Sequence, residues 1–156
     1  MLSLAPVAWG DFEALLAIRV EALRESLERL GRFDPERARE RLAAGFKPEH
    51  MHHITQGGAR VGFITLRPDA GAVPPTMQLD HLYVRPVHQN QGIGAWALNW
   101  AKTQAAKQGC DITLSALKHS AANCFYLSHG FVQVDESEFD LNYRWFQPRE
   151  CQREHA

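Results

Sequence analysis

The segment HLYVRPVHQNQGIGAWALNWA, residues 81–101, constrains the fold most strongly. An apolar, strand-like run is followed by a polar turn, and Gly92-Ile93-Gly94 then opens an amphipathic run. Glycine allows close approach of a ligand and backbone dihedrals that other residues resist. The first N–H groups of a helix lack intrahelical partners and lie at its positive end. The pattern therefore predicts a strand–turn–helix unit that either binds an anion, typically phosphate, or is a plain tight turn.

Hydrophobic periodicity and turn residues predict further helices and strands on either side of this unit. The expected strands are 2–7, 50–56, 60–68, 77–84, 111–117, 131–139 and 141–146. The expected helices begin after Asp11, at Pro35, at Gly94 and near Ser120, and end near Gly31, Gly45, Gly109 and Gly130. This order predicts a mixed α/β (α+β) fold with helices on both faces of one sheet. We expect a single domain over residues 1–147 and a polar tail over 148–156.

The strand at 77–84 has a break in its alternation of apolar residues. Met77 and Leu79 lie in one phase, whereas Leu82 and Val84 lie in the other. One extra residue near Asp80 and His81, a β-bulge, would place all four on one face. The alternative is a central strand that is apolar on both faces.

Bulk properties and cysteine usage exclude several classes of function. The formal net charge of −1 gives no general reason to expect a nucleic-acid partner. No apolar run is long enough to span a membrane, and the three cysteines form no CxxC pair. His50 and His52 would share a strand face, but two ligands do not make a metal site, so we expect no metal. We expect a cytoplasmic protein without a membrane partner.

A dinucleotide-binding reading is disfavoured, although GIGAWA fits the pattern GxGxxA. That fingerprint should follow its strand within a residue or two, and here RPVHQNQ intervenes. The acid expected at the end of the next strand is missing, because Asp111 begins that strand. A P-loop is excluded, since the turn does not end in GK[ST].

The residues around the turn resemble those of the GNAT superfamily of N-acetyltransferases. QNQGIGA, residues 89–95, matches its acyl-CoA signature (Q/R)xxGx(G/A), and LDHLYVRP is similar to its fourth strand. SAANCFYLSHGF, residues 120–131, resembles the motif NxxAxxxYxxxGF, although the Asn that opens that motif is replaced. The resemblance covers about residues 77–131 and implies a central, mostly antiparallel twisted sheet of six to seven strands with a splayed parallel pair.

The same resemblance implies a function and a binding site. An acetyl group would pass from acetyl-CoA, as cosubstrate, to a primary amine of a small molecule or peptide by direct attack in a ternary complex. The pyrophosphate would bind the N–H groups of residues 91–95, and the pantetheine arm would pair with the strand at 82–84. The implied coenzyme-binding residues are Leu82, Tyr83, Val84, Gln89, Asn90, Gln91, Gly92, Ile93, Gly94, Ala95 and Tyr126.

Two implied catalytic residues correspond to motif positions. The N–H group of Leu82 would polarise the thioester carbonyl. Tyr126 would protonate the thiolate leaving group. The alternative for Tyr126 is a core aromatic residue, but Phe125 and Leu127 can supply core contacts, which favours the acid role.

The general base is left open by the sequence. Gln78 stands where histone-type relatives have a carboxylate, and it cannot serve as a base. Asp80 is the nearest replacement, His81 is its rival, and water is a third choice. His119 and His129 are expected to be surface residues.

The sequence also leaves two alternative functions and the nature of the acceptor open. The runner-up function is a non-catalytic acyl-CoA-binding sensor or assembly module, and the third is a nicotinamide oxidoreductase. Arg24, Arg29 and Arg32 could bind an acidic acceptor or simply form a solvated helix face. The resemblance also admits a homodimer, because relatives often dimerise through terminal strands.

Overall fold

The computed structural model describes residues 1–148, which form two compact units. The first unit comprises Met1–Leu66 and Asp80–Leu98, and the second comprises Arg67–Leu79 and the chain from Asn99 onward. Seven strands are hydrogen-bonded in the order β1-β2-β3-β4-β5-β7-β6, and strands β3 and β4 run through both units.

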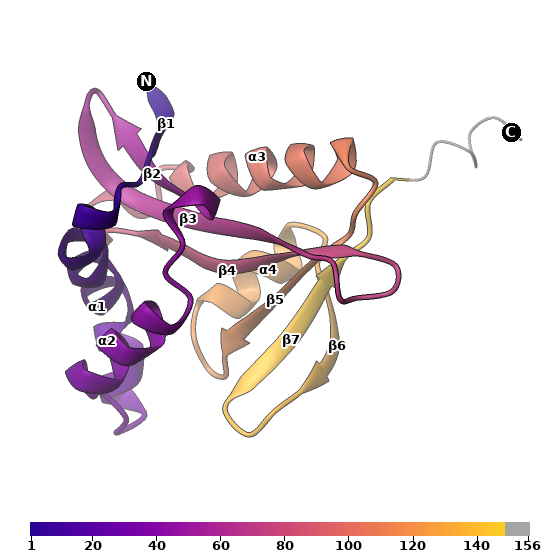
Figure 1. The fold of residues 1–156 in the computed structure, drawn as a ribbon. Helices are drawn as coiled ribbons and strands as arrows, with labels where there is room; N and C mark the ends of the chain where they lie inside the picture. The colour runs from indigo at the N-terminus through magenta and orange to yellow at the C-terminus, as the bar shows by residue number, and fades with distance from the viewer. Residues whose placement is uncertain (149–156) are drawn as a thin grey trace, which may run out of the picture. The chain divides into compact units, whose positions relative to one another are not determined.

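The first unit contains an antiparallel set of strands and two helices (Figure 1). β1 pairs with β2 and β2 with β3, all antiparallel. The bounds are β1 Leu2–Pro6, η1 Trp9–Asp11, α1 Phe12–Arg29, α2 Pro35–Ala44, η2 Pro48–His50, β2 Met51–Gln56 and β3 Ala59–Asp69. Helices α1 and α2 lie against each other, and their inward side chains join those of β2 and β3 in a core. The buried members of that core are Val7, Leu15, Leu16, Ile18, Ala38, Leu42, Met51 and Phe63.

The start of α2 follows from its local sequence. The Asp34 side chain accepts hydrogen bonds from the N–H groups of Glu36 and Arg37, at 3.1 and 3.3 Å. Pro35 occupies the first turn, where a missing N–H costs nothing. The predicted beginning at Pro35 is confirmed.

Strand β4, Thr76–Val84, lies unusually close to β3 at one point. A Cβ atom added to Gly62 would overlap with the carbonyl oxygen of Tyr83 and lie 3.1 Å from Cα of Val84. The N–H group of Arg85 also donates to the carbonyl oxygen of Val61, at 2.8 Å. Glycine at position 62 therefore permits the backbone approach that holds the last residues of β4.

The second unit contains the only parallel strand pair in the described chain. β4 pairs with β5 at Met77↔Ile112 and Gln78↔Thr113. β5 pairs antiparallel with β7, and β7 with β6, the orange-to-yellow strands in Figure 1. The bounds are β5 Ile112–Leu117, α4 Ala122–Ser128, β6 Val132–Glu136 and β7 Asp140–Trp145. α3, Ile93–Lys107, enters this unit at Asn99 and precedes β5, as a parallel crossover requires.

The observed class agrees with the prediction from sequence. The fold is mixed α/β, with a seven-stranded, mostly antiparallel sheet and one parallel pair. The prediction of one domain over residues 1–147 stays a prediction. Most of the predicted tail, residues 149–156, lies outside the described residues.

One local prediction is wrong. His50 was expected in a strand with His52, but it ends the 3-10 helix η2, where its N–H group donates to the carbonyl oxygen of Lys47 at 3.0 Å. Pro48 at the first position of that helix favours the tight turn, so β2 begins only at Met51. His50 and His52 therefore do not share a strand face.

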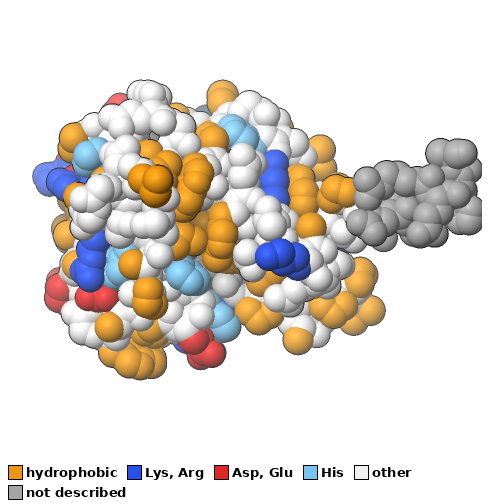
Figure 2. Space-filling model, turned by 90° about the horizontal axis from the view of Figure 1, so that it is seen from above, with side chains coloured by type: hydrophobic (Ala, Val, Ile, Leu, Met, Phe, Trp, Pro, Cys, Tyr) orange, Lys and Arg blue, Asp and Glu red, His pale blue; other side chains and the backbone are white. Residues whose placement is uncertain are grey.

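On the face drawn in Figure 2, acidic and basic side chains of the described residues are scattered without an extended patch of one sign. Within residues 1–148, none of the helices has the length and apolar character that crossing a membrane requires.

Candidate functional site

The turn between β4 and α3 is held together by its own hydrogen bonds. The 3-10 helix η3, Pro86–His88, follows the strand directly. The N–H group of Gln89 donates to the carbonyl oxygen of Pro86 at 3.2 Å. The side-chain Nε2 of Gln89 donates to the carbonyl oxygen of Val84 at 2.9 Å. Gln89 thus ties the end of the strand to the beginning of the helix.

The backbone just after Gln89 presents uncommitted donors. The first helical hydrogen bond of α3 runs from the N–H group of Trp96 to the carbonyl oxygen of Gly92, at 3.0 Å. Among residues 1–148, no group accepts from the six consecutive N–H groups of residues 90–95. Asn90, Gln91 and Gly92 are exposed. Free N–H groups at the positive end of a 15-residue helix can accommodate an anion.

Backbone conformation explains one of the two glycines in the turn. Gly92 has φ +80°, a value that side-chain-bearing residues rarely adopt. Nothing lies within 4 Å of the position that a Cβ atom on Gly92 would occupy. The glycine is therefore required by its dihedral angle, and the space beside it is open to a ligand. Asn90, with φ 63°, is a residue type that tolerates this conformation.

The parallel ladder between β4 and β5 is short. It contains the pairs at Met77 and Gln78 and does not extend to Leu82 or Val84. Both of these residues are half-buried. The resemblance implied such a splayed pair, whereas the β-bulge near Asp80 stays a prediction.

His81 lies in a mostly apolar environment on β4. Its Nδ1 is hydrogen-bonded to Oγ1 of Thr65 at 3.0 Å, and its ring lies 5.7 Å from that of Phe63 and 5.9 Å from that of Tyr83, between centroids. Burial and then the positive charge of Arg19 lower the pKa of His81 from 6.5 to about 4. The imidazole is therefore neutral at physiological pH. Asp80, the other base candidate, is half-buried and precedes it on the strand.

Sequence reasoning missed Arg19, which the structure places beside these residues. Arg19 is 8% exposed, on α1, and its guanidinium carbon lies 5.9 Å from the ring centroid of Tyr83. The available signal was its position in the apolar stripe of the helix, together with Leu15 and Leu16. A charged residue within such a stripe is rarely buried without a reason.

Tyr126 belongs to the second unit, on α4. It is 8% exposed, and its ring lies 5.5 Å from that of Phe131 and 5.2 Å from that of Phe125. The expectation that Leu127 supplies core contacts is wrong, because this side chain is 54% exposed. α4 directs position 126, not 127, inward, so Tyr126 packs as a core aromatic residue, and its acid role stays a prediction.

The two remaining histidine candidates also lie in the second unit. His119 is exposed, as predicted. His129 is half-buried, and its Nδ1 is hydrogen-bonded to the carbonyl oxygen of Phe125 at 2.9 Å. His129 was predicted to be a surface residue, and it is only partly exposed.

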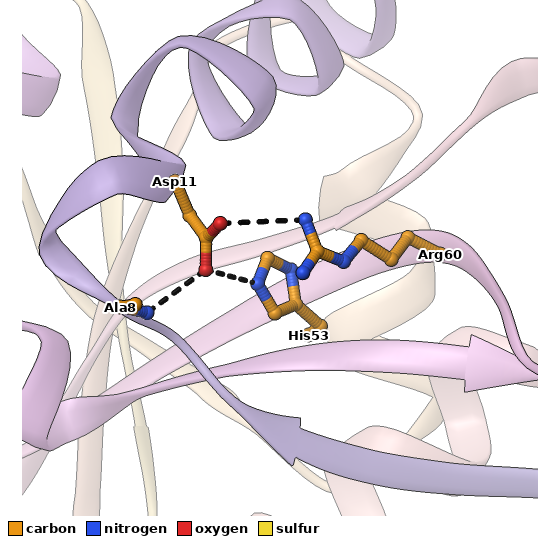
Figure 3. A network of polar contacts seen from close by, with 4 residues as sticks. All are labelled: Ala8, Asp11, His53 and Arg60. Carbon is orange, nitrogen blue, oxygen red and sulfur yellow. Dashed lines mark hydrogen bonds and ion pairs between the residues drawn. The ribbon is translucent and has the colours of Figure 1, made fainter.

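A further polar network lies where α1 begins (Figure 3). One carboxylate, Asp11, accepts from the N–H group of Ala8 and Nε2 of His53, both at 2.9 Å, and from Nη1 of Arg60 at 3.4 Å. The bond from Ala8 and that from His53 lower the pKa of Asp11 to about 2. His53 is fully buried, so this network anchors the helix to strands β2 and β3 rather than contacting a ligand. No group of three or more metal-ligating side chains occurs in residues 1–148.

Comparison with protein families assigns the chain. Residues 47–133, more than half of the sequence, match the model of the acetyltransferase (GNAT) domain. The chain belongs to the GNAT acetyltransferase family. A comparison with curated proteins finds no match.

Solved structures of GNAT proteins share this fold. PaiA N-acetyltransferase from Thermoplasma acidophilum, in complex with coenzyme A, is 18% identical with a TM-score of 0.75, over 94% of this chain and 99% of that one. An acetyltransferase from Thermus thermophilus is 20% identical with a TM-score of 0.72, over 92% and 96%. The ribosomal-protein-S18-alanine N-acetyltransferase from Escherichia coli is 17% identical with a TM-score of 0.70, over 96% of each chain. At these identities the likeness supports the fold alone.

Proposed function

We propose that this protein is an acetyl-CoA-dependent N-acetyltransferase that acetylates a primary amine of a small molecule or peptide. One observation carries the proposal. A member of the GNAT family presents six uncommitted N–H groups, those of residues 90–95, at the beginning of α3. Such a set matches the charge and the oxygen acceptors of a diphosphate. The related PaiA structure was solved with coenzyme A, which agrees with this assignment.

The coenzyme would be held by two parts of the chain. The N–H groups of residues 91–95 would bind the pyrophosphate, with Gln89 and Asn90 bordering it. The pantetheine arm is rich in amides and would hydrogen-bond to β4 at residues 82–84, as an added strand does. The short parallel ladder, which stops at Gln78, supports this role because it does not involve these residues.

The reaction is a direct transfer with balanced bonds and protons. The ammonium group of the acceptor first loses a proton to a base, and the free amine then attacks the thioester carbonyl carbon. A C–N bond forms and the C–S bond breaks, so the electron pair leaves on sulfur. The nitrogen loses its second proton to water as the neutral amide forms. The N–H group of Leu82 would stabilise the oxyanion, and Tyr126 would protonate the thiolate.

Two side chains on β4 are candidates for the base. Asp80 would attract the ammonium group and accept its proton directly or through water. His81, with a pKa of about 4, is neutral and can accept a hydrogen bond at neutral pH, but it is a weak base in this state. Asp80 therefore remains the first choice, with His81 and water as its alternatives.

Coenzyme binding is the first test. Isothermal titration calorimetry with coenzyme A should detect binding that Gly92→Ala weakens about tenfold, because the substitution strains a backbone with φ +80°. Gly71→Ala is the control, since its nearest neighbour, Oδ1 of Asp69, lies 3.5 Å away. NAD(H) should not compete. The proposal fails if coenzyme A at millimolar concentration releases no heat with the folded protein.

Catalysis is the second test, with a panel of amines and acetyl-CoA. Tyr126→Phe should lower kcat roughly 100-fold with an unchanged affinity for coenzyme A. Tyr143→Phe, also on a buried tyrosine, should leave kcat within about twofold. Coenzyme binding without acetylation of any amine would instead favour a non-catalytic acyl-CoA-binding module.

A further inference from the structure

We propose that the acceptor carries a carboxylate and that Arg19 binds it, which makes the substrate a small amino acid or a related amino-carboxylate. This inference rests on the proposed function and names the substrate class of the same site. It starts from an arginine that the described structure leaves without a partner of opposite charge.

The guanidinium of Arg19 is buried, and one of its nitrogens lacks a hydrogen-bond partner. It is 8% exposed, and its Nη1 donates to the carbonyl oxygen of Ala38 at 3.2 Å. Its Nε is buried and has no hydrogen-bond partner. No carboxylate in residues 1–148 forms an ion pair with it. Burying a charge without a counterion costs free energy that an apolar side chain of similar size would not cost.

Two other charges on the same helix have partners of opposite charge. Glu13 forms an ion pair with Arg39 at 2.6 Å, and Arg24 with Glu28 at 2.7 Å. These groups are exposed and need no ligand. From the sequence, Arg24, Arg29 and Arg32 either bind an acidic acceptor or form a solvated helix face. The structure points instead to Arg19.

The position of Arg19 fits an acceptor whose amine lies near the candidate bases. Its guanidinium carbon and the ring of His81 each lie 5.9 Å from the ring centroid of Tyr83. The guanidinium carbon of Arg19 and the ring centroid of His81 are therefore at most about twice 5.9 Å apart. The planar guanidinium fork matches a carboxylate, which can accept from two N–H groups at once. Because the Arg19 guanidinium is mostly buried, it favours the carboxylate of a small molecule over an extended acidic surface.

A carboxylate at Arg19 would also act on His81. His81 contacts Thr65 and Phe63 on β3 and Tyr83 on β4, and Arg19 on α1 is the charged group that shifts its pKa. Asp80 precedes it on the strand. Neutralising Arg19 would raise the pKa of His81 from about 4 toward its usual value. The bound acceptor would thus improve the neighbouring imidazole as a base.

Matched pairs of acceptors test the inference. Glycine, β-alanine and γ-aminobutyrate are compared with their amides, which keep the amine and lose the carboxylate. In the wild type, kcat/KM should favour the acids by roughly 30-fold or more. Arg19→Met should abolish this preference chiefly through KM, and Arg19→Lys should restore part of it. Arg24→Met, at an exposed arginine, should retain it.

Two outcomes of the kinetics would overturn the inference. One is a wild type that prefers the amides, and the other is an Arg19→Met variant that loses activity on acids and amides equally. Circular dichroism melting and coenzyme A binding of each variant show whether it is folded. A preference for peptides ending in a free carboxylate over single amino acids would reassign the acceptor to a peptide and overturn the small-molecule assignment.

A binding measurement keeps this inference separate from the proposed function. NMR titration of His81 with β-alanine, without acetyl-CoA, should raise the pKa of His81 by at least about half a unit in the wild type and not in Arg19→Met. No change in the wild type means that only water satisfies Arg19, and the inference fails. If β-alanine raises the pKa of His81 but coenzyme A does not bind, Arg19 still binds a carboxylate. The proposed acetyltransferase function is then wrong.

Discussion

Arg19 in the first unit and Asp111 in the second are both buried charges, but only Asp111 has a partner of opposite charge in the described chain. Asp111 is 6% exposed, and its Oδ2 accepts from Nε and Nη2 of Arg144 at 2.9 and 2.8 Å. Its Oδ1 accepts from the N–H group of Gln147 at 2.9 Å. Arg19 makes one hydrogen bond, to Ala38. The buried carboxylate in the second unit has its counterion, whereas the arginine in the first unit has none among residues 1–148.

The difference shows how to separate structural from functional polar groups. A buried group whose hydrogen bonds are all made within the protein contributes to specifying the fold. A buried group that lacks its partners is destabilising, and such groups concentrate at sites that bind ligands.

Asp111→Ala should lower the free energy of unfolding by about 3 to 4 kcal/mol. It leaves the Arg144 guanidinium and the N–H group of Gln147 without their acceptor. Urea denaturation measures the change. Glu13→Ala, which breaks an exposed pair with Arg39, should cost less than about 1 kcal/mol. Equal losses in the two variants would show that the buried pair is no more important than a surface pair.

The stability of the protein should fall as the pH falls from about 6.5 to about 4, through His81. In the unfolded chain this histidine takes up its proton near pH 6.5, but in the folded protein only near pH 4, so the unfolded state binds more protons in this window. The loss should be roughly 3 kcal/mol. Denaturation at several pH values measures it, and His81→Gln should flatten the curve there.

A second acid effect provides an internal check on that titration. Asp11 has a pKa of about 2 in the folded protein and about 3.8 in the unfolded chain, so its contribution is complete above pH 3.8 and is lost between pH 3.8 and pH 2. The two windows do not overlap. A curve that is flat from pH 7 to pH 4 would contradict the environment described for His81.

Tyr143→Phe should lower the free energy of unfolding by about 1 kcal/mol. The hydroxyl of Tyr143, a residue 2% exposed, donates to Oδ1 of Asn123 at 2.8 Å, and Nδ2 of Asn123 donates to the carbonyl oxygen of Leu117 at 2.9 Å. The substitution removes one hydrogen bond and keeps the ring. Thermal unfolding followed by circular dichroism gives the change, and an unchanged midpoint would show that this hydrogen bond contributes nothing.

Arg19→Met should change the free energy of unfolding least, by less than about 1 kcal/mol, and an increase is within this expectation. Methionine fills similar space without a charge to desolvate. Urea denaturation of Arg19→Met and Asp111→Ala under the same conditions measures the two changes. A loss as large as that of Asp111→Ala would show that Arg19 is a structural residue and would break the comparison.

Much of the fold and part of the site follow from local sequence. Asp34 and Pro35 specify the start of α2, because a side-chain cap and a restricted φ act within one turn. Gly92 marks the turn before α3 because its positive φ is a local demand. The amphipathic run after it predicted α3, and the resemblance around it led to the GNAT family, which the family model confirms.

The remaining features depend on contacts between residues far apart in the sequence. Neither the loss of His50 from β2 nor the exposure of Leu127 was visible in the pattern, because both depend on where a neighbouring element turns the chain. Arg19 was visible only as one polar residue in an apolar stripe. Whether Arg19 pairs with a carboxylate depends on its neighbours in the folded chain. These are a carbonyl group on α2 and an aromatic ring on β4.

The sequence alone thus determined where the helices and strands lie and which backbone turn can bind an anion, because periodicity and dihedral preference act over a few residues. Tertiary structure decided which charges are matched. Electrostatic satisfaction depends on distance in space, and residues as far apart in sequence as Arg19 and Tyr83 become neighbours only when the chain is folded.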